Sequence, residues 1–320
     1  DTLALCMHEH YEDCVWREQA LYTFDSRNEM LCDYFAFENS GFARANLLLI
    51  AKGVRDDGFL ELTYPAVDTP AIPLYSLCYV VQVYEYVKFT GDKSILPEVG
   101  KTLDGIMNNF RKLADNRLIA DFQYPFWNFY EWGNDSDNCG DLSRQKDALS
   151  PTRYSLILNA YYVYAEERFA ALFPDKATDV GGIKDLISAE FYNPDKKMFR
   201  AYKGEENYTE FANAMAILIG VGDKTVAREI AEGKAKKATL AAAAYVYDAL
   251  LSYGDEFKER VLSEIDDNYK KMLDAGATSF WETLKGVTEN DRSCSLCHGW
   301  SALPIYYYAV TGKIKYEKED

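Results

Sequence analysis

Residues 72–89 read IPLYSLCYVVQVYEYVKF, and apolar or aromatic side chains occupy most of the circumference of the helix that this stretch predicts. Residues 154–173, YSLILNAYYVYAEERFAALF, have the same character. A helix that is apolar on most sides has to be covered on more than one side. Residues 98–113 and 256–273 instead carry apolar residues on one stripe and charges elsewhere, which is typical of helices that face water. The alternation predicts helical hairpins arranged in an inner and an outer layer.

Residues that begin and end helices recur along the whole chain. Ser26 and Glu29 have the spacing of a capping box, which predicts a helix over the apolar run from Met30 through Phe37. Further starts are predicted at Thr69-Pro70 and Ser150-Pro151, ends at Gly91, Gly254 and Gly312, and short strand-like pieces at Leu118–Phe122 and Met198–Tyr202. Helices therefore dominate the prediction.

The chain has the organisation of one domain. No linker rich in Pro, Gly or Ser and no shift in composition divides it, so we expect a single domain over residues 1–320, cut from a longer multidomain protein. Two short sequences weakly resemble each other, FTGDK at residues 89–93 and AVTGK at residues 309–313, and each lies at the end of a predicted Tyr-rich helix. The predicted fold is all-α, a closed α/α toroid of helical hairpins. In a closed toroid the first and last hairpins are neighbours.

Charge and hydropathy exclude two classes of partner. The formal net charge of −16 argues against nucleic acid, because affinity for phosphates depends on Lys and Arg. No apolar run approaches the roughly 18 residues of a membrane span, so we expect no membrane partner. The first residues, DTLALCMHEH, show no signal peptide, although one can precede this sequence in a longer protein.

The cysteines indicate the compartment. Their number, seven, is odd, and most of them lie within apolar stretches, which favours buried free thiols over a disulfide framework. Buried free thiols are typical of a reducing compartment. We therefore expect a cytoplasmic protein.

All five tryptophans and all three histidines fall in three short segments, residues 8–18, 127–132 and 281–300. Each segment also carries acids. Flat aromatic faces stack on sugar rings, and carboxyl groups bind hydroxyls and act on the glycosidic oxygen. The clustering indicates a carbohydrate site, and closure of a toroid would bring the first and last segments to one central cleft.

The first segment contains DCVWRE at residues 13–18, and a second acid, Asp25, follows it. Two interpretations are open. Arg17 can pair with Asp13 on a solvated helix face while Glu18 points to water. Alternatively, these charges serve one another or a ligand, because desolvating them beside a tryptophan is otherwise costly.

The run D-C-x-x-R-E, with a second Asp twelve residues after the first, resembles the catalytic signature of the α-L-rhamnosidases of glycoside hydrolase family 78. The resemblance implies a six-hairpin (α/α)6 toroid and hydrolysis of terminal α-L-rhamnose with inversion. Asp13, Arg17, Glu18 and Asp25 match the shorter spelling of that signature, in which Glu18 is the general acid. In a longer spelling the acid position falls on Gln19, whose amide cannot act as a carboxylic acid.

Two further motifs carry the resemblance. GATSFWE at residues 276–282 is similar to the family's G-x-T-T-x-W-E, whose last residue, here Glu282, is the general base. SLCHGW at residues 295–300 resembles the S-x-x-H that follows, and YEW at residues 130–132 resembles a G-D-W with Glu131 in place of Asp. The expected substrate contacts are Asp13, Arg17, Asp25, Glu131, Trp132, Trp281, His298 and Trp300.

The resemblance also implies a division of roles. Glu18 would donate a proton to the glycosidic oxygen while Glu282 deprotonates a water on the opposite face of the sugar. We expect Trp16 to exclude water from the Glu18 carboxyl. Two alternatives remain: a catalytically silent sugar-binding relative, and a six-hairpin hydrolase for another sugar, such as a modified deoxyhexose or a uronide. The oligomeric state is left open.

Two motifs suggest metals or haem instead. Residues 294–298, CSLCH, have the C-x-x-C-H pattern of haem attachment, and their cysteine pair also suggests a zinc or redox site. The run enters an apolar-aromatic stretch, which favours a buried turn. His8 and His10 offer two metal ligands without an identifiable third, so hydrogen bonding at the cleft edge is the preferred interpretation. We expect no metal and no cofactor.

Overall fold

The computed structural model describes residues 1–66, 70–131, 152–288 and 294–315, and it is dominated by helices. The elements are α1 (Thr2–Leu5), α2 (Thr23–Ala36), α3 (Ser40–Lys52), α4 (Pro73–Thr90), α5 (Leu96–Ala114), α7 (Leu156–Leu172), η1 (Pro174–Lys176), α8 (Gly181–Phe191), β1 (Tyr192–Asn193), β2 (Met198–Phe199), α9 (Glu210–Leu218), α10 (Lys224–Ala231), α11 (Ala243–Leu251), η2 (Gly254–Glu256), α12 (Lys258–Asp274), η3 (Gly286–Thr288), η5 (Gly299–Ala302) and α13 (Pro304–Val310).

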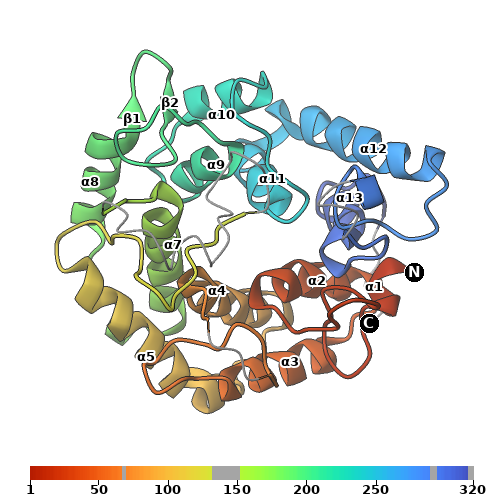
Figure 1. Ribbon diagram of the computed structural model, residues 1–320, viewed down its shortest axis with the longest axis horizontal. Helices are drawn as coiled ribbons and strands as arrows, with labels where there is room; N and C mark the ends of the chain where they lie inside the picture. Colours follow the sequence, from red (N-terminus) through yellow and green to blue (C-terminus); the bar gives the residue numbers. More distant parts are fainter. Residues whose placement is uncertain (67–69, 132–151, 289–293, 316–320) are drawn as a thin grey trace.

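The helices form two concentric layers (Figure 1). The inner layer runs through α2, α4, α7, α9, α11 and α13, and the outer layer includes α3, α5, α8, α10 and α12. The ring closes where α13 packs against α2, and the Tyr307 hydroxyl of α13 donates to the Ala244 carbonyl of α11 at 2.7 Å. The predicted all-α toroid is confirmed. No helix in the described part of the chain is long and apolar enough to cross a membrane.

The two kinds of helix occupy the two layers as predicted. Every residue from Pro73 through Val83 of α4 is buried, and so is every residue from Leu156 through Glu166 of α7. Helix α5 buries only a stripe of residues three or four apart, which includes Leu103 and Phe110. Inner helices are covered by neighbours on all sides, whereas outer helices present their charged faces to water.

The capping box predicted at Ser26 and Glu29 is wrong. Helix α2 begins earlier, at Thr23, and the Ser26 hydroxyl donates to the Thr23 carbonyl at 3.2 Å from inside the first turn. Glu29 is buried and lies against Gly299, where a Cβ atom would meet the carboxyl oxygen at 1.7 Å. The Glu29 side chain therefore packs against η5 instead of capping the start of the helix.

Other boundaries are displaced by a few residues. Helix α4 begins at Pro73 rather than Pro70, and α7 begins after the N-cap residue Ser155. Gly91 ends α4 in the left-handed conformation, as predicted, with φ of 73°. Thr69, Ser150 and Pro151 lie outside the described residues, Gly254 and Gly312 follow the last residues of α11 and α13 at a short distance, and of the two strand-like pieces only residues 198–199 form a strand, paired with β1.

Arg27 of α2 is an ionised side chain held inside the ring. It is 1% exposed, and its Nη2 lies 2.6 Å from Oε1 of Glu85 on α4 and 3.5 Å from Oδ2 of Asp248 on α11. Its guanidinium also lies 4.2 Å from the centre of the Tyr245 ring. One cation thus joins three inner helices, and its removal would leave buried carboxylates unpaired.

We expect Arg27→Met to lower the free energy of unfolding by about 3–5 kcal/mol, because a buried ion pair that loses one partner leaves an uncompensated charge. Urea denaturation followed by far-UV circular dichroism measures the change. Arg228→Met is the matched control, since Arg228 pairs with Glu256 at the surface. Equal unfolding midpoints for the two variants would show that the buried network does not stabilise the ring.

Candidate active site

The first segment folds into a loop that closes on itself and docks on the last segment. The Asp13 backbone N–H donates to the Ala20 carbonyl at 3.1 Å, and Oδ1 of Asp13 accepts from the Ala20 N–H at 2.8 Å. The Gly299 N–H donates to the Asp13 carbonyl at 2.8 Å, and Cys14 pairs with His298 in a β-bridge. Closure of the ring therefore brings two segments from opposite ends of the sequence into contact.

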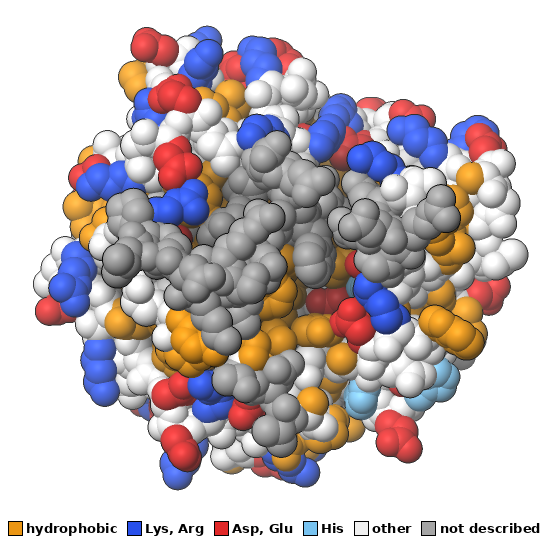
Figure 2. All heavy atoms as spheres, viewed as in Figure 1, with side chains coloured by type: hydrophobic (Ala, Val, Ile, Leu, Met, Phe, Trp, Pro, Cys, Tyr) orange, Lys and Arg blue, Asp and Glu red, His pale blue; other side chains and the backbone are white. Residues whose placement is uncertain are grey.

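A small cavity lies where these segments meet, with a volume of about 180 Å³. It is lined by Asp13, Arg17, Glu18, Tyr22, Asp25, Ile72, Tyr75, Trp127, Phe129, Glu282, His298 and Trp300. All three segments singled out in the sequence contribute, together with the N-terminal ends of α2 and α4. On the face of the molecule shown in Figure 2, hydrophobic side chains gather near the centre with acidic and basic side chains beside them, and further charged side chains lie around the perimeter.

Arg17 joins the two carboxylates named by the sequence. Its Nη2 lies 3.2 Å from Oε1 of Glu18 and 3.2 Å from Oε2 of Glu282, so these two oxygens are no more than twice that distance apart. Glu282 is 5% exposed, and its Oε2 also accepts the Ser295 N–H at 2.7 Å. Glu18 is exposed and accepts the Tyr22 hydroxyl at 2.9 Å. The interpretation that pairs Arg17 with Asp13 on a solvated helix is wrong.

Burial sets the protonation of the acids around the cavity. It raises the pKa of Glu282, while the Ser295 N–H and the Arg17 cation partly lower it. Burial also raises the pKa of Asp13 to about 6, against the hydrogen bond from the Ala20 N–H. The pKa of Asp25 rises well above its ordinary value, first because of burial and then because of the nearby acids. The cavity therefore contains carboxyl groups that hold protons unusually tightly.

His298 and Trp300 form the wall beside Glu282. Burial lowers the pKa of His298 well below its ordinary value, so its contact with Asp25, 3.9 Å from Nε2 to Oδ1, joins a neutral imidazole to a carboxyl that favours its protonated form. The His298 ring lies 3.8 Å from the Trp300 ring, centre to centre. The Trp300 indole N–H donates to the Glu282 carbonyl at 3.1 Å, which fixes the backbone of that acid.

Three predicted contact residues are not among the described residues that line the cavity. Glu131 is buried, and its Oε1 accepts both the N–H and, at 2.8 Å, the hydroxyl of Thr239. Trp281 is partly buried against the core, and its carbonyl accepts the Ser301 hydroxyl at 2.6 Å. Trp132 lies outside the described residues.

Glu18 lines the cavity, whereas its loop neighbours Trp16 and Gln19 are not among the described lining residues. Trp16 is 90% exposed, so the expectation that it excludes water from Glu18 is wrong. Gln19 has a φ of 53°, is exposed, and donates its amide to the Val15 carbonyl at 3.0 Å. Of Glu18 and Gln19, only Glu18 is among the residues that line the cavity.

Several lining residues were missed in the sequence: Tyr22, Ile72, Tyr75, Trp127 and Phe129. Tyr22 carries a weak signal, because it follows Glu18 by four residues. Trp127 begins the aromatic segment of residues 127–132. The motif recognised in that segment, YEW at residues 130–132, lies at its end and does not include Trp127. Ile72 and Tyr75 lie at the start of the inner helix α4. Their apolar and aromatic neighbours in the sequence are those of core residues, so nothing in the sequence marks them as lining a cavity.

The two histidines outside the cavity have local partners, and the described cysteines carry free thiols. Nδ1 of His8 lies 3.0 Å from Oε1 of Glu12, and Nδ1 of His10 lies 2.9 Å from the Tyr11 carbonyl. Among the residues described, no group of three or more His, Cys, Asp or Glu side chains could hold a metal ion. The described free cysteines include five that are buried, Cys6, Cys14, Cys32, Cys78 and Cys294, and one that is partly buried, Cys297.

The fold has counterparts among solved structures. The family 78 rhamnosidase of Bacillus sp. GL1 superposes with a TM-score of 0.82 at 20% identity, over 96% of this chain and 33% of that one. A Klebsiella oxytoca rhamnosidase with rhamnose bound gives 0.78 at 20% identity, over 97% and 62%. The family 63 mannosylglycerate hydrolase of Thermus thermophilus gives 0.64 at 11% identity, over 96% and 98%. The chain thus spans about a third of the length of the Bacillus enzyme and somewhat under two thirds of the length of the Klebsiella enzyme.

The sequence itself identifies the family. No curated protein matches the chain. The family described as the bacterial alpha-L-rhamnosidase 6 hairpin glycosidase domain matches residues 1–310, nearly the entire chain. Together with the closed helical ring, this match shows that the chain belongs to the bacterial alpha-L-rhamnosidase six-hairpin glycosidase domain family.

Proposed function

We propose that this chain is the catalytic domain of a glycoside hydrolase that releases a terminal deoxyhexose, α-L-rhamnose above all, with inversion. One observation carries the proposal: Glu18 and Glu282 come from opposite ends of the sequence and meet on one nitrogen of Arg17 in an aromatic-walled cavity. The cavity volume, about 180 Å³, is below the range of drug-sized pockets, which favours a single sugar ring.

The environments of the two carboxyls support different roles. Burial raises the pKa of Glu282, and the Ser295 N–H and the Arg17 cation oppose that rise, so these two contacts favour the ionised form that a general base requires. Glu18 is exposed at the mouth of the cavity, where a leaving group attached to a terminal sugar would pass into solvent. One guanidinium nitrogen of Arg17 contacts both carboxyls. Inversion needs about 6.5–9.5 Å between carboxyls to admit the attacking water. The two oxygens on Arg17 are no more than twice 3.2 Å apart, so the carboxyls would have to move apart when the sugar binds.

The walls of the cavity suit a deoxyhexose. Asp13, Asp25 and His298 would bind sugar hydroxyls, and the Nδ1 atom of His298 is buried without a hydrogen-bond partner among the described residues. Ile72 and Phe129 offer an apolar surface to the methyl group that replaces a hydroxyl in a deoxyhexose. Trp127 and Trp300 are the aromatic members that would flank the ring.

The cavity is less suited to a uronide. Arg17 is the one basic side chain among the described lining residues that is charged near neutral pH, and Glu18 and Glu282 already occupy it. Two of the predicted contacts, Glu131 and Trp281, would act by holding the walls through Thr239 and Ser301, and Trp132 remains a predicted contact.

The substrate is tested with aryl glycosides. We expect hydrolysis of an aryl α-L-rhamnoside to exceed that of the matching mannoside, glucoside and glucuronide, with β-L-rhamnose as the first product seen by proton NMR. Release of α-L-rhamnose first would contradict inversion. Saturable binding of L-rhamnose without turnover of any glycoside would favour the silent sugar-binding relative.

The assignment of acid and base is tested by isosteric amides. Glu18→Gln and Glu282→Gln should each lower kcat on the aryl α-L-rhamnoside by about 10²-fold or more, because each removes one proton-transfer group. Gln19→Ala is the matched control from the same loop and should retain activity. Full activity of Glu18→Gln, or a loss in Gln19→Ala as large as that in Glu18→Gln, would overturn the assignment of the acid.

The role of Arg17 is tested by the pH profile of kcat/KM. Its cation lowers the pKa of Glu282, so Arg17→Met should raise that pKa and protonate the base at higher pH. The acidic limb of the profile should therefore move to higher pH by about one unit. Arg228→Met, a change at a distant surface arginine, should leave the limb in place. An unmoved limb in Arg17→Met would show that Arg17 does not control the base.

A further inference from the structure

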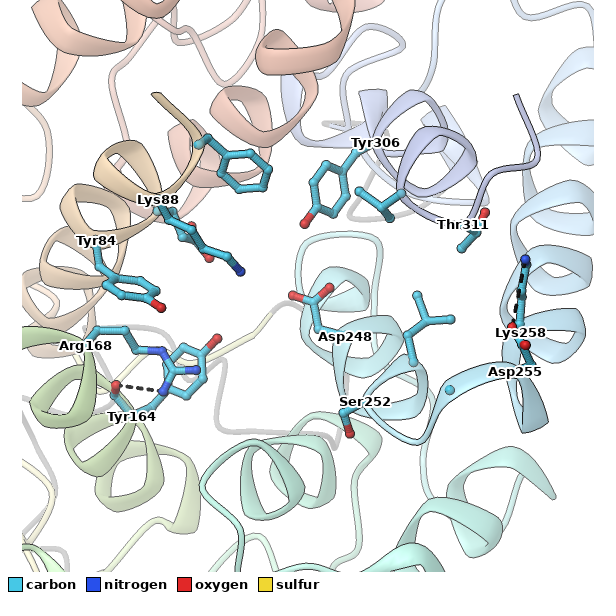
Figure 3. Close-up of a pocket in the computed structure, with 15 residues that line it drawn as sticks. Tyr84, Lys88, Tyr164, Arg168, Asp248, Ser252, Asp255, Lys258, Tyr306 and Thr311 are labelled. Carbon is cyan, nitrogen blue, oxygen red and sulfur yellow. Dashed lines mark hydrogen bonds and ion pairs between the residues drawn. The ribbon is translucent and has the colours of Figure 1, made fainter. Parts of the chain in front are cut away.

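A second and larger cavity lies at the opposite end of the ring, with a volume of about 490 Å³ (Figure 3). Helix α4 relates the two cavities. Tyr75 near its start lines the cavity of the two carboxylates, whereas Tyr84 and Lys88 near its end line the second one. The helix carries the chain about 14 Å along its axis between Tyr75 and Tyr84. None of the described residues lines both cavities.

The acidic side chains that line this second cavity are partly neutralised by nearby cations. Glu85 and Asp248 line it, and the buried guanidinium of Arg27 contacts both. Asp248 also accepts the Tyr307 hydroxyl at 2.9 Å. The third acid, Asp255, lies 4.0 Å from the ammonium group of Lys258. These carboxylates therefore do not make the cavity strongly negative.

Two cations project toward the space between the helices. Figure 3 shows Lys88 of α4 and Arg168 of α7 directed toward the cavity, across from Asp248 of α11. The Arg168 guanidinium stacks on Tyr164, 3.2 Å from the ring centre, and its Nη1 lies 3.2 Å from Oε2 of Glu167. Lys88 has no ion pair with any residue that the structure describes. An unpaired ammonium beside a guanidinium favours an anion, even in a chain with a net charge of −16.

Neutral hydrogen-bonding groups complete the lining. The Tyr84 hydroxyl lies on the same side as Lys88, and the Tyr306 hydroxyl points inward above Asp248 (Figure 3). Hydroxyl groups both donate and accept, so they pair with the hydroxyls of a ligand, as the carboxylate of Asp248 also does. The cavity thus has Lys88 and Arg168 on the wall formed by α4 and α7, with Asp248 and the Tyr306 hydroxyl across from them.

We propose that this cavity is a second ligand site, distinct from the carboxylate pair, that binds a small hydroxylated carboxylic acid such as a sugar acid. The ligand's carboxylate contacts Lys88 and Arg168, and its hydroxyls contact Asp248 and Tyr306. The site does not depend on the proposed hydrolysis, because it shares no described lining residue with the other cavity.

The test is titration of the full chain with D-glucuronate, followed by isothermal calorimetry, with D-glucose as the neutral probe of matched shape. We expect saturable binding of glucuronate and much weaker binding of glucose. Lys88→Met should weaken glucuronate binding by roughly tenfold, since a charge-assisted hydrogen bond is lost. Lys88 is exposed, so the variant keeps the fold. Lys101→Met, at an exposed position of α5, is the matched control and should bind as the unmodified chain does.

Glu282→Gln and saturating L-rhamnose separate this site from the proposed active site. Both should leave glucuronate binding unchanged. Loss of glucuronate binding under either condition would place the ligand in the carboxylate cavity and overturn the proposal. Absence of saturable binding, equal binding of glucose, or unchanged binding in Lys88→Met would overturn it as well. None of these outcomes depends on whether the chain hydrolyses a rhamnoside.

Discussion

The structure depends on one constraint: the inner helices α4 and α7 are buried on all sides over about three turns. Helices α4 and α7 bury consecutive residues over three turns, so an inner helix with an uncovered side would expose apolar surface to water. A closed ring is the arrangement in which every inner helix has two inner neighbours and an outer cover. Closure in turn requires α13 to pack on α2, and this contact carries the loop of residues 13–20 to the segment of residues 282–300.

The interior of the ring separates two cavities of different chemistry. The Tyr75 and Tyr245 rings both stack on Phe24, with ring centres 5.9 and 5.6 Å from it, and Arg27 lies over the Tyr245 ring. On one side of this packing, burial keeps acids close to protonation and aromatic rings form the walls. On the other side, Arg27 pairs with Glu85 and Asp248, and Lys88 has no ion pair with a residue in the described part of the chain. The cavity at the beginnings of these helices is thus lined mainly by acids and aromatic rings, and the cavity at their ends by both acids and cations.

The fold and part of the site were predictable because they depend on local patterns. The distribution of apolar residues distinguishes inner from outer helices without reference to any other part of the chain. Glu18 and Glu282 were found through motifs, and both line the cavity. Glu131 was chosen by the same kind of argument, yet its carboxyl binds Thr239, because packing against the segment that precedes α11 determines where it points.

The sequence by itself determined the helical layers, the closure of the chain into a ring and the residue types that meet at one of its ends, since periodicity and motif spacing are properties of neighbouring residues. Only the tertiary structure decided which of these side chains reach the cavity. Trp16 points to water, Arg17 bridges two acids, and Trp127 enters from a third segment. The protonation of the acids was decided there too, because a pKa depends on burial and on charges contributed by residues far away in the chain.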